Sequence, residues 1–280
     1  MDGAEHLADV FVCPLCAGAF GVRDGRTLVC PAGHAFDVAR EGYANLVPAQ
    51  SRRSKEPGYN SELMTARHRF FASGGYRPVA EAVAGLAAGA AGPGARLLDA
   101  GCGEGYYLRV LRERAPGLDL LGTDVSRPGV RTASRADPAG AYAVASSYAL
   151  PVPDASLDVL VSHFSPNPVE EFARVLRPGG TLLVGGPGAD HLFSLKAAVY
   201  DHPRRHDEDK HVLTDPRFTP AGREVVRYEL PVGDPGTLAA LFTMTPYSYG
   251  ATDADRLLGR SGGAFGTEVH VVLDRYVRTS

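Results

Sequence analysis

Short apolar runs alternate with amphipathic segments along the C-terminal two thirds of the chain. From Ala95 onward, the runs ARLLDAG, DLLGTDV and LDVLVSHF have the length and composition of buried strands. Between them, YYLRVLRERA and VEEFARVL repeat apolar residues at helical spacing. Strands that alternate with helices pair in parallel through right-handed crossovers. The pattern therefore predicts an α/β fold with a doubly wound, mostly parallel sheet.

The segments before this alternation predict two further parts of the chain. Residues 12–38 contain brief apolar pieces separated by glycines, and they are too few to form a hydrophobic core alone. Residues 48–60 are polar, basic and proline-bearing, which is typical of a linker, and a helix is predicted from Ser61, as N-cap, through Phe71. We therefore predict a small module over residues 1–47, a basic linker with bridging helices over 48–92, and the large domain over 93–280.

A cluster of cysteines and one histidine lies in the small module. Two residues separate Cys13 from Cys16, thirteen separate Cys16 from Cys30, and three separate Cys30 from His34. Ligands spaced in this way on facing turns complete a tetrahedron that suits Zn²⁺. The N-terminus MDGAEHLADVF lacks the pattern of a secretory signal, so we expect a cytoplasmic protein, in which thiols favour metal over disulfides. All four positions are filled by protein, which predicts a structural site.

A glycine-rich loop follows the first strand of the large domain. In LLDAGCGEGYY, the strand ends at Asp99, and Gly101, Gly103 and Gly105 allow a ligand to approach the backbone closely. The next strand ends at Asp124, where a carboxylate can bind both ribose hydroxyls. A dehydrogenase is disfavoured, because its loop reads G-x-G-x-x-G and Glu104 would repel a pyrophosphate. S-adenosylmethionine, which has no phosphate, is the predicted cofactor.

The chain as a whole is slightly acidic, but one segment of it is basic. The formal net charge of -3 argues against a protein that coats nucleic acid through bulk electrostatics. Between residues 40 and 77, however, the chain has seven lysines and arginines and only three acidic residues. We expect a polyanion to meet the protein there, and we predict that Arg52, Arg53 and Lys55 bind substrate.

Two longer motifs resemble one known family. HAFDVAREGYANL, from His34 to Leu46, and GCGEGYY, from Gly101 to Tyr107, together with the late MTPYSY, resemble the RlmA family. These are zinc-containing methyltransferases that use S-adenosylmethionine to modify N1 of one guanine in a hairpin loop of 23S ribosomal RNA. The resemblance implies a class I, Rossmann-like fold with a seven-stranded sheet, a zinc module that helps to hold the RNA, and a homodimer.

The resemblance and the strand ends assign candidate roles to individual residues. Removal of the guanine N1 proton calls for a base, and the candidates are His163, after the fourth strand, and Asp190 or His191, after the fifth. Phe164, Tyr106 and Tyr247 are candidates for stacking on the acceptor base. The predicted cofactor-binding residues are Asp99, Gly101, Gly103, Glu104, Gly105, Tyr106, Asp124, Ser146 and Ser147, and the predicted zinc ligands are Cys13, Cys16, Cys30 and His34.

Two alternatives stay open at this point. The turn HFSPNPVEEF departs from the family pattern where it faces the methyl group, and with the net charge it leaves room for a small heteroaromatic metabolite as substrate. A zinc-dependent RNA-binding protein without catalysis is the other alternative, which the intact cofactor loop disfavours. The charged segment from Asp201 to His211 is expected to be a solvated loop.

Overall fold

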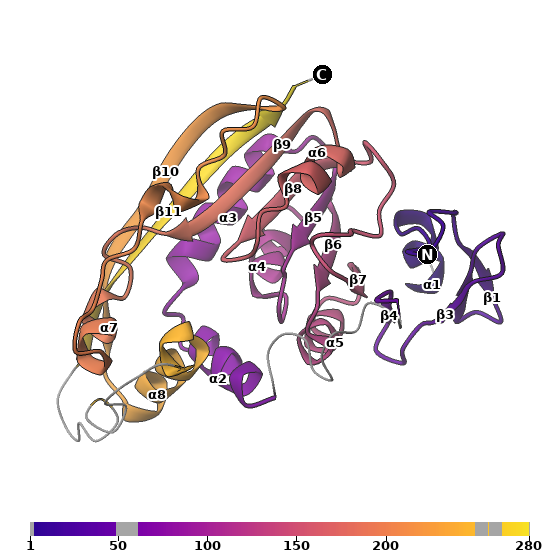
Figure 1. Ribbon diagram of the computed structural model, residues 1–280. Helices are drawn as coiled ribbons and strands as arrows, with labels where there is room; N and C mark the ends of the chain where they lie inside the picture. The colour runs from indigo at the N-terminus through magenta and orange to yellow at the C-terminus, as the bar shows by residue number, and fades with distance from the viewer. Residues whose placement is uncertain (1–2, 49–60, 250–256, 258–264, 280) are drawn as a thin grey trace.

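A sheet of eight strands forms the centre of the computed structural model, which describes residues 3–48, 61–249, 257 and 265–279 (Figure 1). The strand order is β10-β11-β9-β8-β5-β6-β7-β4, and within it β11 runs antiparallel to both β10 and β9 while the other neighbours are parallel. The strands are β4 (Tyr43–Asn45), β5 (Arg96–Ala100), β6 (Asp119–Asp124), β7 (Ala141–Val144), β8 (Leu157–His163), β9 (Leu176–Pro187), β10 (Phe218–Val232) and β11 (Phe265–Arg278).

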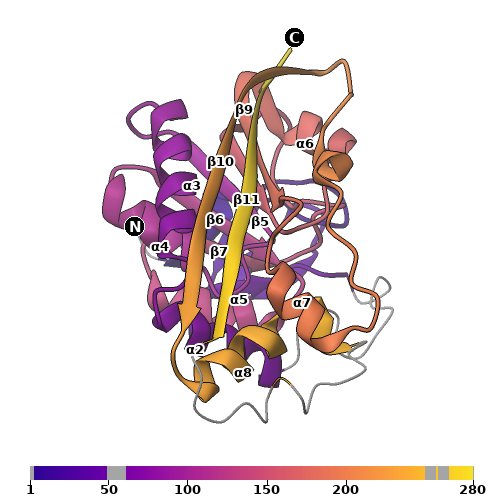
Figure 2. The ribbon, with the colours of Figure 1, turned by 90° about the vertical axis from the view of Figure 1, so that its left-hand side faces the viewer.

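Helices cover both faces of this sheet, as its alternating side chains require. In β5, Leu97 packs into a cluster shared with α3 and α4, whereas Leu98 faces a second cluster shared with α1 and α6. Figure 2 shows the antiparallel pair β10–β11 running the length of the molecule toward α2 and α8. The helices are α1 (Gly3–Val10), α2 (Ser61–Ala72), α3 (Arg77–Ala90), α4 (Tyr106–Arg114), α5 (Arg127–Ala136), α6 (Val169–Val175), α7 (Phe193–Val199) and α8 (Pro235–Met244), with 3-10 turns η2 (Glu208–His211) and η3 (Pro246–Tyr249).

The N-terminal module docks on one edge of the large sheet. Its own antiparallel sheet contains β1 (Gly21–Arg23), β2 (Thr27–Val29) and β3 (Ala35–Asp37). Two groups of polar contacts join it to the sheet: His6 Nε2 lies 2.7 Å from Asp119 Oδ1, and Arg96 donates to both Asp9 and Asp119. The strand β4 then pairs in parallel with β7. The predicted module ends at residue 47, yet its last strand belongs to the large sheet.

The predicted class of fold is confirmed, and two of the eight strands, β4 and β10, were not located in the sequence. Seven strands were expected, and β4 is the eighth, because three residues are too few to show an alternating pattern. The fifteen-residue β10 was not predicted either, since Pro220, Gly222 and Pro231 interrupt it and one of its sides is exposed. The predicted helix from Ser61 is α2. In the part of the chain that the structure describes, no helix is long and apolar enough to cross a membrane.

Candidate active site

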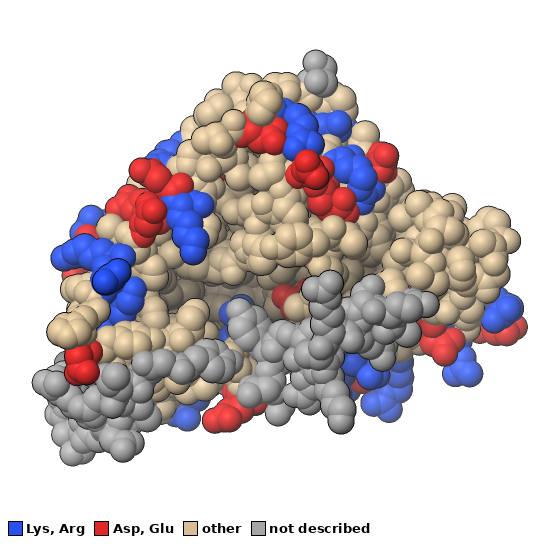
Figure 3. Space-filling model, in the orientation of Figure 1, with Lys and Arg blue, Asp and Glu red and all other residues tan. Residues whose placement is uncertain are grey.

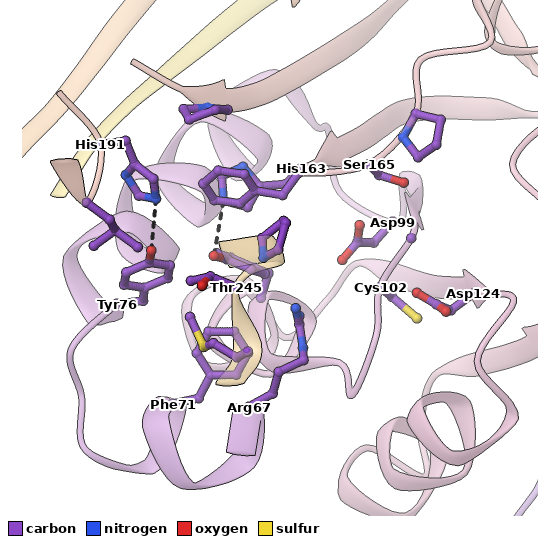
Figure 4. A pocket seen from close by; sticks show the side chains of 18 of the residues that line it. Arg67, Phe71, Tyr76, Asp99, Cys102, Asp124, His163, Ser165, His191 and Thr245 are labelled. Carbon is purple, nitrogen blue, oxygen red and sulfur yellow. Dashed lines mark hydrogen bonds between the residues drawn. The ribbon is translucent and has the colours of Figure 1, made fainter. Parts of the chain in front are cut away.

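A cavity of about 400 Å³ opens at the carboxyl ends of the central strands (Figure 4). Parallel strands present their ends at one edge, where α/β sheets bind ligands. The cavity is roofed by α2 and by the segment that joins α8 to η3. Its lining includes Arg67, Phe71, Tyr76, Asp99, Gly101, Cys102, Tyr107, Asp124, His163, Phe164, Ser165, His191, His206, Thr245 and Tyr247.

The glycine loop has the conformation that the motif requires. Gly101, Gly103 and Gly105 all have positive φ, of 102°, 55° and 75°, which side chains rarely adopt. A Cβ on Gly101 would overlap the hydroxyl of Ser165. The loop also fixes Asp124, whose carboxylate accepts hydrogen bonds from Gly103 N at 2.9 Å and Ser126 N at 2.7 Å. The absence of a side chain at Gly101 therefore lets Ser165 pack against the loop, and both residues line the cavity.

Two buried carboxylates stand beside this loop. Burial and the neighbouring Asp124 raise the pKa of Asp99 to about 7, and burial also raises the pKa of Asp124. A cationic ligand group would stabilise the ionised form of both. The amino group and sulfonium of S-adenosylmethionine supply such charges, and no phosphate has to approach Glu104. The residues present thus fit this cofactor.

Four other predicted cofactor residues are not among the described residues that line the cavity: Gly103, Glu104, Gly105 and Tyr106. Glu104 is 1% exposed, and its carboxylate faces His68 Nδ1 at 3.4 Å and Arg109 at 3.6 Å. The ring of Tyr106 stacks on Phe71 with centroids 4.3 Å apart. The backbone of Gly105 adopts a left-handed conformation at the start of α4. These residues shape the loop and its roof.

A second, wider groove of about 1010 Å³ adjoins the cavity at Val125, which lines both. Ser146 lines this groove, together with Tyr148 and the Cys13–Ala17 turn of the N-terminal module, whereas Ser147 is absent from both linings among the described residues. The hydroxyl of Ser146 accepts a hydrogen bond from Tyr148 N at 3.2 Å. The predicted cofactor residue Ser146 therefore lies in the groove that meets the cavity at Val125, the residue after Asp124.

The four predicted metal ligands come together at one point. One ligand atom from each of Cys13, Cys16, Cys30 and His34 lies within 4.8 Å of the others. Neighbouring ligands are 3.4 to 3.6 Å apart, with Cys30 Sγ to His34 Nδ1 at 3.4 Å and Cys16 Sγ to Cys30 Sγ at 3.6 Å. Zn–S and Zn–N bonds of about 2.3 and 2.1 Å in a tetrahedron require almost these separations. The site fits Zn²⁺.

His163 lines the cavity, but its ring nitrogens face protein groups. Nε2 is 3.0 Å from the hydroxyl of Tyr107, and a Cβ on Gly185 would overlap Nδ1. Burial, with the charge of Arg67, lowers the pKa of His163 to about 3, so the imidazole is neutral at pH 7. The geometry suits a group that holds Tyr107 in place.

The two candidates after the fifth sheet strand differ in position. His191 lines the cavity, and its Nδ1 accepts a hydrogen bond from His270 N at 3.3 Å, so Nε2 carries the proton and donates to Tyr76 at 3.0 Å. Burial lowers the pKa of His191 to about 3. Asp190 is not in the described lining and pairs with Arg205 and with Arg227, the latter at 2.9 Å.

Of the three predicted stacking residues, Phe164 and Tyr247 line the cavity, whereas Tyr106 is not in its described lining. Phe164 is 40% exposed and has a left-handed backbone with φ of 52°, and its ring lies 4.4 Å from that of His163. Tyr247 lies in the cavity wall, and its hydroxyl forms a hydrogen bond with His206 Nε2 at 2.7 Å. His206 belongs to the segment expected to be a solvated loop, and half-burial against Tyr247 corrects that expectation for this residue. Arg52, Arg53 and Lys55 lie outside the described residues.

Sequence reasoning missed several lining residues that come from α2 and its surroundings. Arg67, Phe71 and Tyr76 precede the cofactor loop in the chain, and none of them is assigned a role at the site from the sequence. The apolar spacing of α2 predicted a helix, but not which sheet edge it would cover. Only its place in the fold shows that this helix roofs the cavity.

Comparison with known proteins gives consistent results. The family described as "RlmA, N-terminal" matches residues 11–55, and the one described as "Methyltransferase domain" matches residues 98–184. The 23S rRNA (guanine(748)-N(1))-methyltransferase of Streptomyces fradiae is 40% identical over 256 residues, which cover 89% of this chain and 88% of that protein. A relative from Micromonospora griseorubida is 36% identical over 89% of each chain.

A solved structure confirms the fold alone. A chain from the complex of the Haloferax volcanii Trm112 methyltransferase activator with a methyltransferase superposes with a TM-score of 0.51 at 21% identity. The match covers 80% of this chain and 100% of that one. The fold is therefore that of the class I methyltransferases.

Proposed function

This chain is a member of the RlmA family of zinc-containing, S-adenosylmethionine-dependent methyltransferases, and on that premise we propose that it methylates N1 of a guanine in a hairpin loop of 23S rRNA. The observation that carries the proposal is one cavity with two chemically different ends. Asp99 and Asp124 stand at one end beside the glycine loop, and His191, which both Phe164 and Tyr247 contact, stands at the other (Figure 4). A cationic cofactor and a planar acceptor base fit these two ends. The name of the Streptomyces fradiae relative supports the choice of guanine N1.

The aromatic end is suited to a base that has left its stack. Bases in RNA loops are recognised by stacking on aromatic rings, and an enzyme that modifies a base edge must extrude it. Phe164 is half-open to solvent, and its strained backbone holds the ring at the cavity mouth beside His191. We propose that Phe164 stacks on the target guanine.

The protein's contribution to methyl transfer is mainly positioning. S-adenosylmethionine, when bound, supplies a methyl group on a sulfonium. Aligning the attacking nitrogen with that carbon accounts for much of the rate enhancement in such in-line reactions. We propose that His163 positions the Tyr107 hydroxyl at the cavity wall, since its Nε2 lies 3.0 Å from that hydroxyl and its Nδ1 is buried against Gly185. Asp190 is engaged by two arginines and is proposed to brace the β9–α7 turn.

The remaining parts of the proposal concern the partners. We propose that the zinc module, with Arg52, Arg53 and Lys55, grips the RNA hairpin, and that the enzyme works as a cytoplasmic homodimer. The module is anchored beside the groove that contains Ser146 and Tyr148, so RNA held by it would lie near the cavity. Salt dependence of RNA binding should fall when the three basic residues are neutralised.

Primer extension on ribosomal RNA tests this function in the cell. Methylation at N1 blocks the pairing edge of guanine, so reverse transcriptase stops one nucleotide before it. The stop should be present in the parent strain, absent after deletion of the gene, and restored by the gene on a plasmid. A stop that persists without the gene would exclude the rRNA assignment.

One observation favours a small heteroaromatic metabolite as the second candidate substrate. On the face shown in Figure 3, the acidic and basic side chains of the described residues are interspersed and form no continuous basic field. A metabolite enzyme would retain the cofactor end of the cavity and would be indifferent to substitution of Arg52, Arg53 and Lys55. RNA binding that is unaffected by these substitutions would favour this candidate.

A further inference from the structure

Arg67 reaches the cofactor end of the cavity from α2. Figure 4 shows its side chain directed from the helix toward Asp99. Its guanidinium lies over the ring of Phe71, 5.1 Å from the centroid, and a Cβ on Gly103 would be 3.2 Å from its Nη2. The absence of a side chain at Gly103 therefore lets the guanidinium lie against the cofactor loop.

Arg67 is the source of positive charge at this end. Among the described residues that line the cavity, it alone is an arginine or lysine, and the two buried histidines are neutral at pH 7. Its field lowers the pKa of both Asp99 and Asp124, against the effect of burial. The described lining thus combines one permanent cation with two carboxylates.

This combination matches an amino acid zwitterion. The methionine end of S-adenosylmethionine carries an ammonium and a carboxylate on one carbon, and a site for it needs an acid and a base a few ångströms apart. Guanidinium groups bind carboxylates through two parallel hydrogen bonds. We propose that Arg67 binds the α-carboxylate of the cofactor while Asp99 takes its ammonium group. The inference rests on the assigned cofactor and is independent of the acceptor substrate.

The roof helix is built to hold Arg67 in this place. Phe71, one turn after Arg67, stacks on Tyr106 at the start of α4. His68, the residue after Arg67, faces the buried Glu104 of the cofactor loop at 3.4 Å. Two contacts to the loop from neighbouring turns of α2 restrict the helix, so the guanidinium is presented to the cavity with little conformational freedom.

The test compares two ligands that differ by one carboxylate. S-adenosylhomocysteine and its decarboxylated analogue are titrated calorimetrically into wild-type protein and into Arg67→Ala, Arg67→Lys and Arg69→Ala variants. Arg69 is the matched control, because it lies on the same helix and pairs with Asp234 outside the cavity lining. Circular dichroism and a thermal melt establish that each variant is folded.

The expected result is a loss that depends on the carboxylate. Arg67→Ala should weaken the affinity for S-adenosylhomocysteine about 10- to 100-fold, as the loss of charged hydrogen bonds does. The affinity for the decarboxylated analogue should change less than about threefold. Arg67→Lys should restore part of the affinity, and Arg69→Ala should change neither ligand.

If Arg67→Ala lowers the affinity for both ligands equally, or for neither, the inference is overturned and Arg67 has a structural role. Wild-type protein that binds neither ligand would overturn the cofactor assignment itself. The two failures are therefore distinguishable in one experiment.

Discussion

Asp99 and Asp124 end neighbouring parallel strands, so their carboxylates share one buried site. The first carries most of the electrostatic cost, because burial and the second carboxylate raise its pKa to about 7. Backbone strain is a second unfavourable feature of the site, because Phe164 has a left-handed backbone that large residues rarely adopt. Both features lie at the ends of the cavity where a ligand is expected, which is where proteins store unfavourable arrangements.

Asp99→Asn should stabilise the ligand-free protein while it removes cofactor binding. The folded-state pKa of about 7 lies above the unfolded value, so the carboxylate destabilises the fold above pH 7, and this penalty fades as the pH falls toward 4. At pH 8 the variant should gain about 4 kcal/mol in free energy of unfolding, measured with urea, and the gain should vanish near pH 4. A gain independent of pH would contradict the assigned pKa shift.

Substitutions of Phe164 should separate stacking from backbone strain. Phe164→Ala and Phe164→Gly should both weaken RNA methylation, since a lost base stack costs about 1 to 3 kcal/mol, and neither should change cofactor affinity. Glycine relieves the left-handed strain, so Phe164→Gly should be about 1 kcal/mol more stable than Phe164→Ala. Methylation unchanged in both variants would exclude a stacking role.

Among the elements, those with periodic patterns or motifs could be predicted and the others could not. The glycine loop between β5 and α4, the acid that ends β6 and the Cys3His cluster follow from local spacing. The strand β4 could not be predicted, because its three residues become a strand only through pairing with β7. The placement of α2 over the cavity depends on long-range contacts, and so Arg67 and Tyr76 were missed.

The role of α2 as a roof predicts different effects for its two adjacent phenylalanines. Phe71→Leu removes the stack on Tyr106 and should lower S-adenosylhomocysteine affinity about 5- to 10-fold, because the helix loses its hold on the cofactor loop. Phe70 is fully buried against Tyr76 and lies outside the cavity lining among the described residues. Phe70→Leu should cost stability with little change in affinity. The same loss of affinity in both variants would contradict a specific role for the Phe71 stack.

At the scale of the whole molecule, the zinc module and the cofactor cavity are attached but separate. The module contacts the sheet through His6, Asp9 and β4, and none of the described residues that line the cavity belongs to it. We therefore expect that loss of the metal weakens RNA binding more than cofactor binding.

Cys30→Ser tests this separation. The variant should lose the zinc, which is expected at about one ion per chain, and should bind 23S rRNA fragments at least about tenfold more weakly in a filter assay. S-adenosylhomocysteine affinity should stay within about threefold of wild type. Cys102→Ala, which removes the buried cysteine outside the cluster, should retain the metal. Full zinc content in Cys30→Ser would refute the ligand assignment.

The most direct measurement is methylation of unmodified 23S rRNA by the purified protein. The transcript is incubated with S-adenosylmethionine and with wild-type or Asp99→Asn protein, and methyl groups are then mapped by reverse transcription. We predict one new stop, next to a guanine in a hairpin loop, that requires both cofactor and wild-type protein. An enzyme that binds S-adenosylhomocysteine but produces no stop at any guanine would contradict the proposed function.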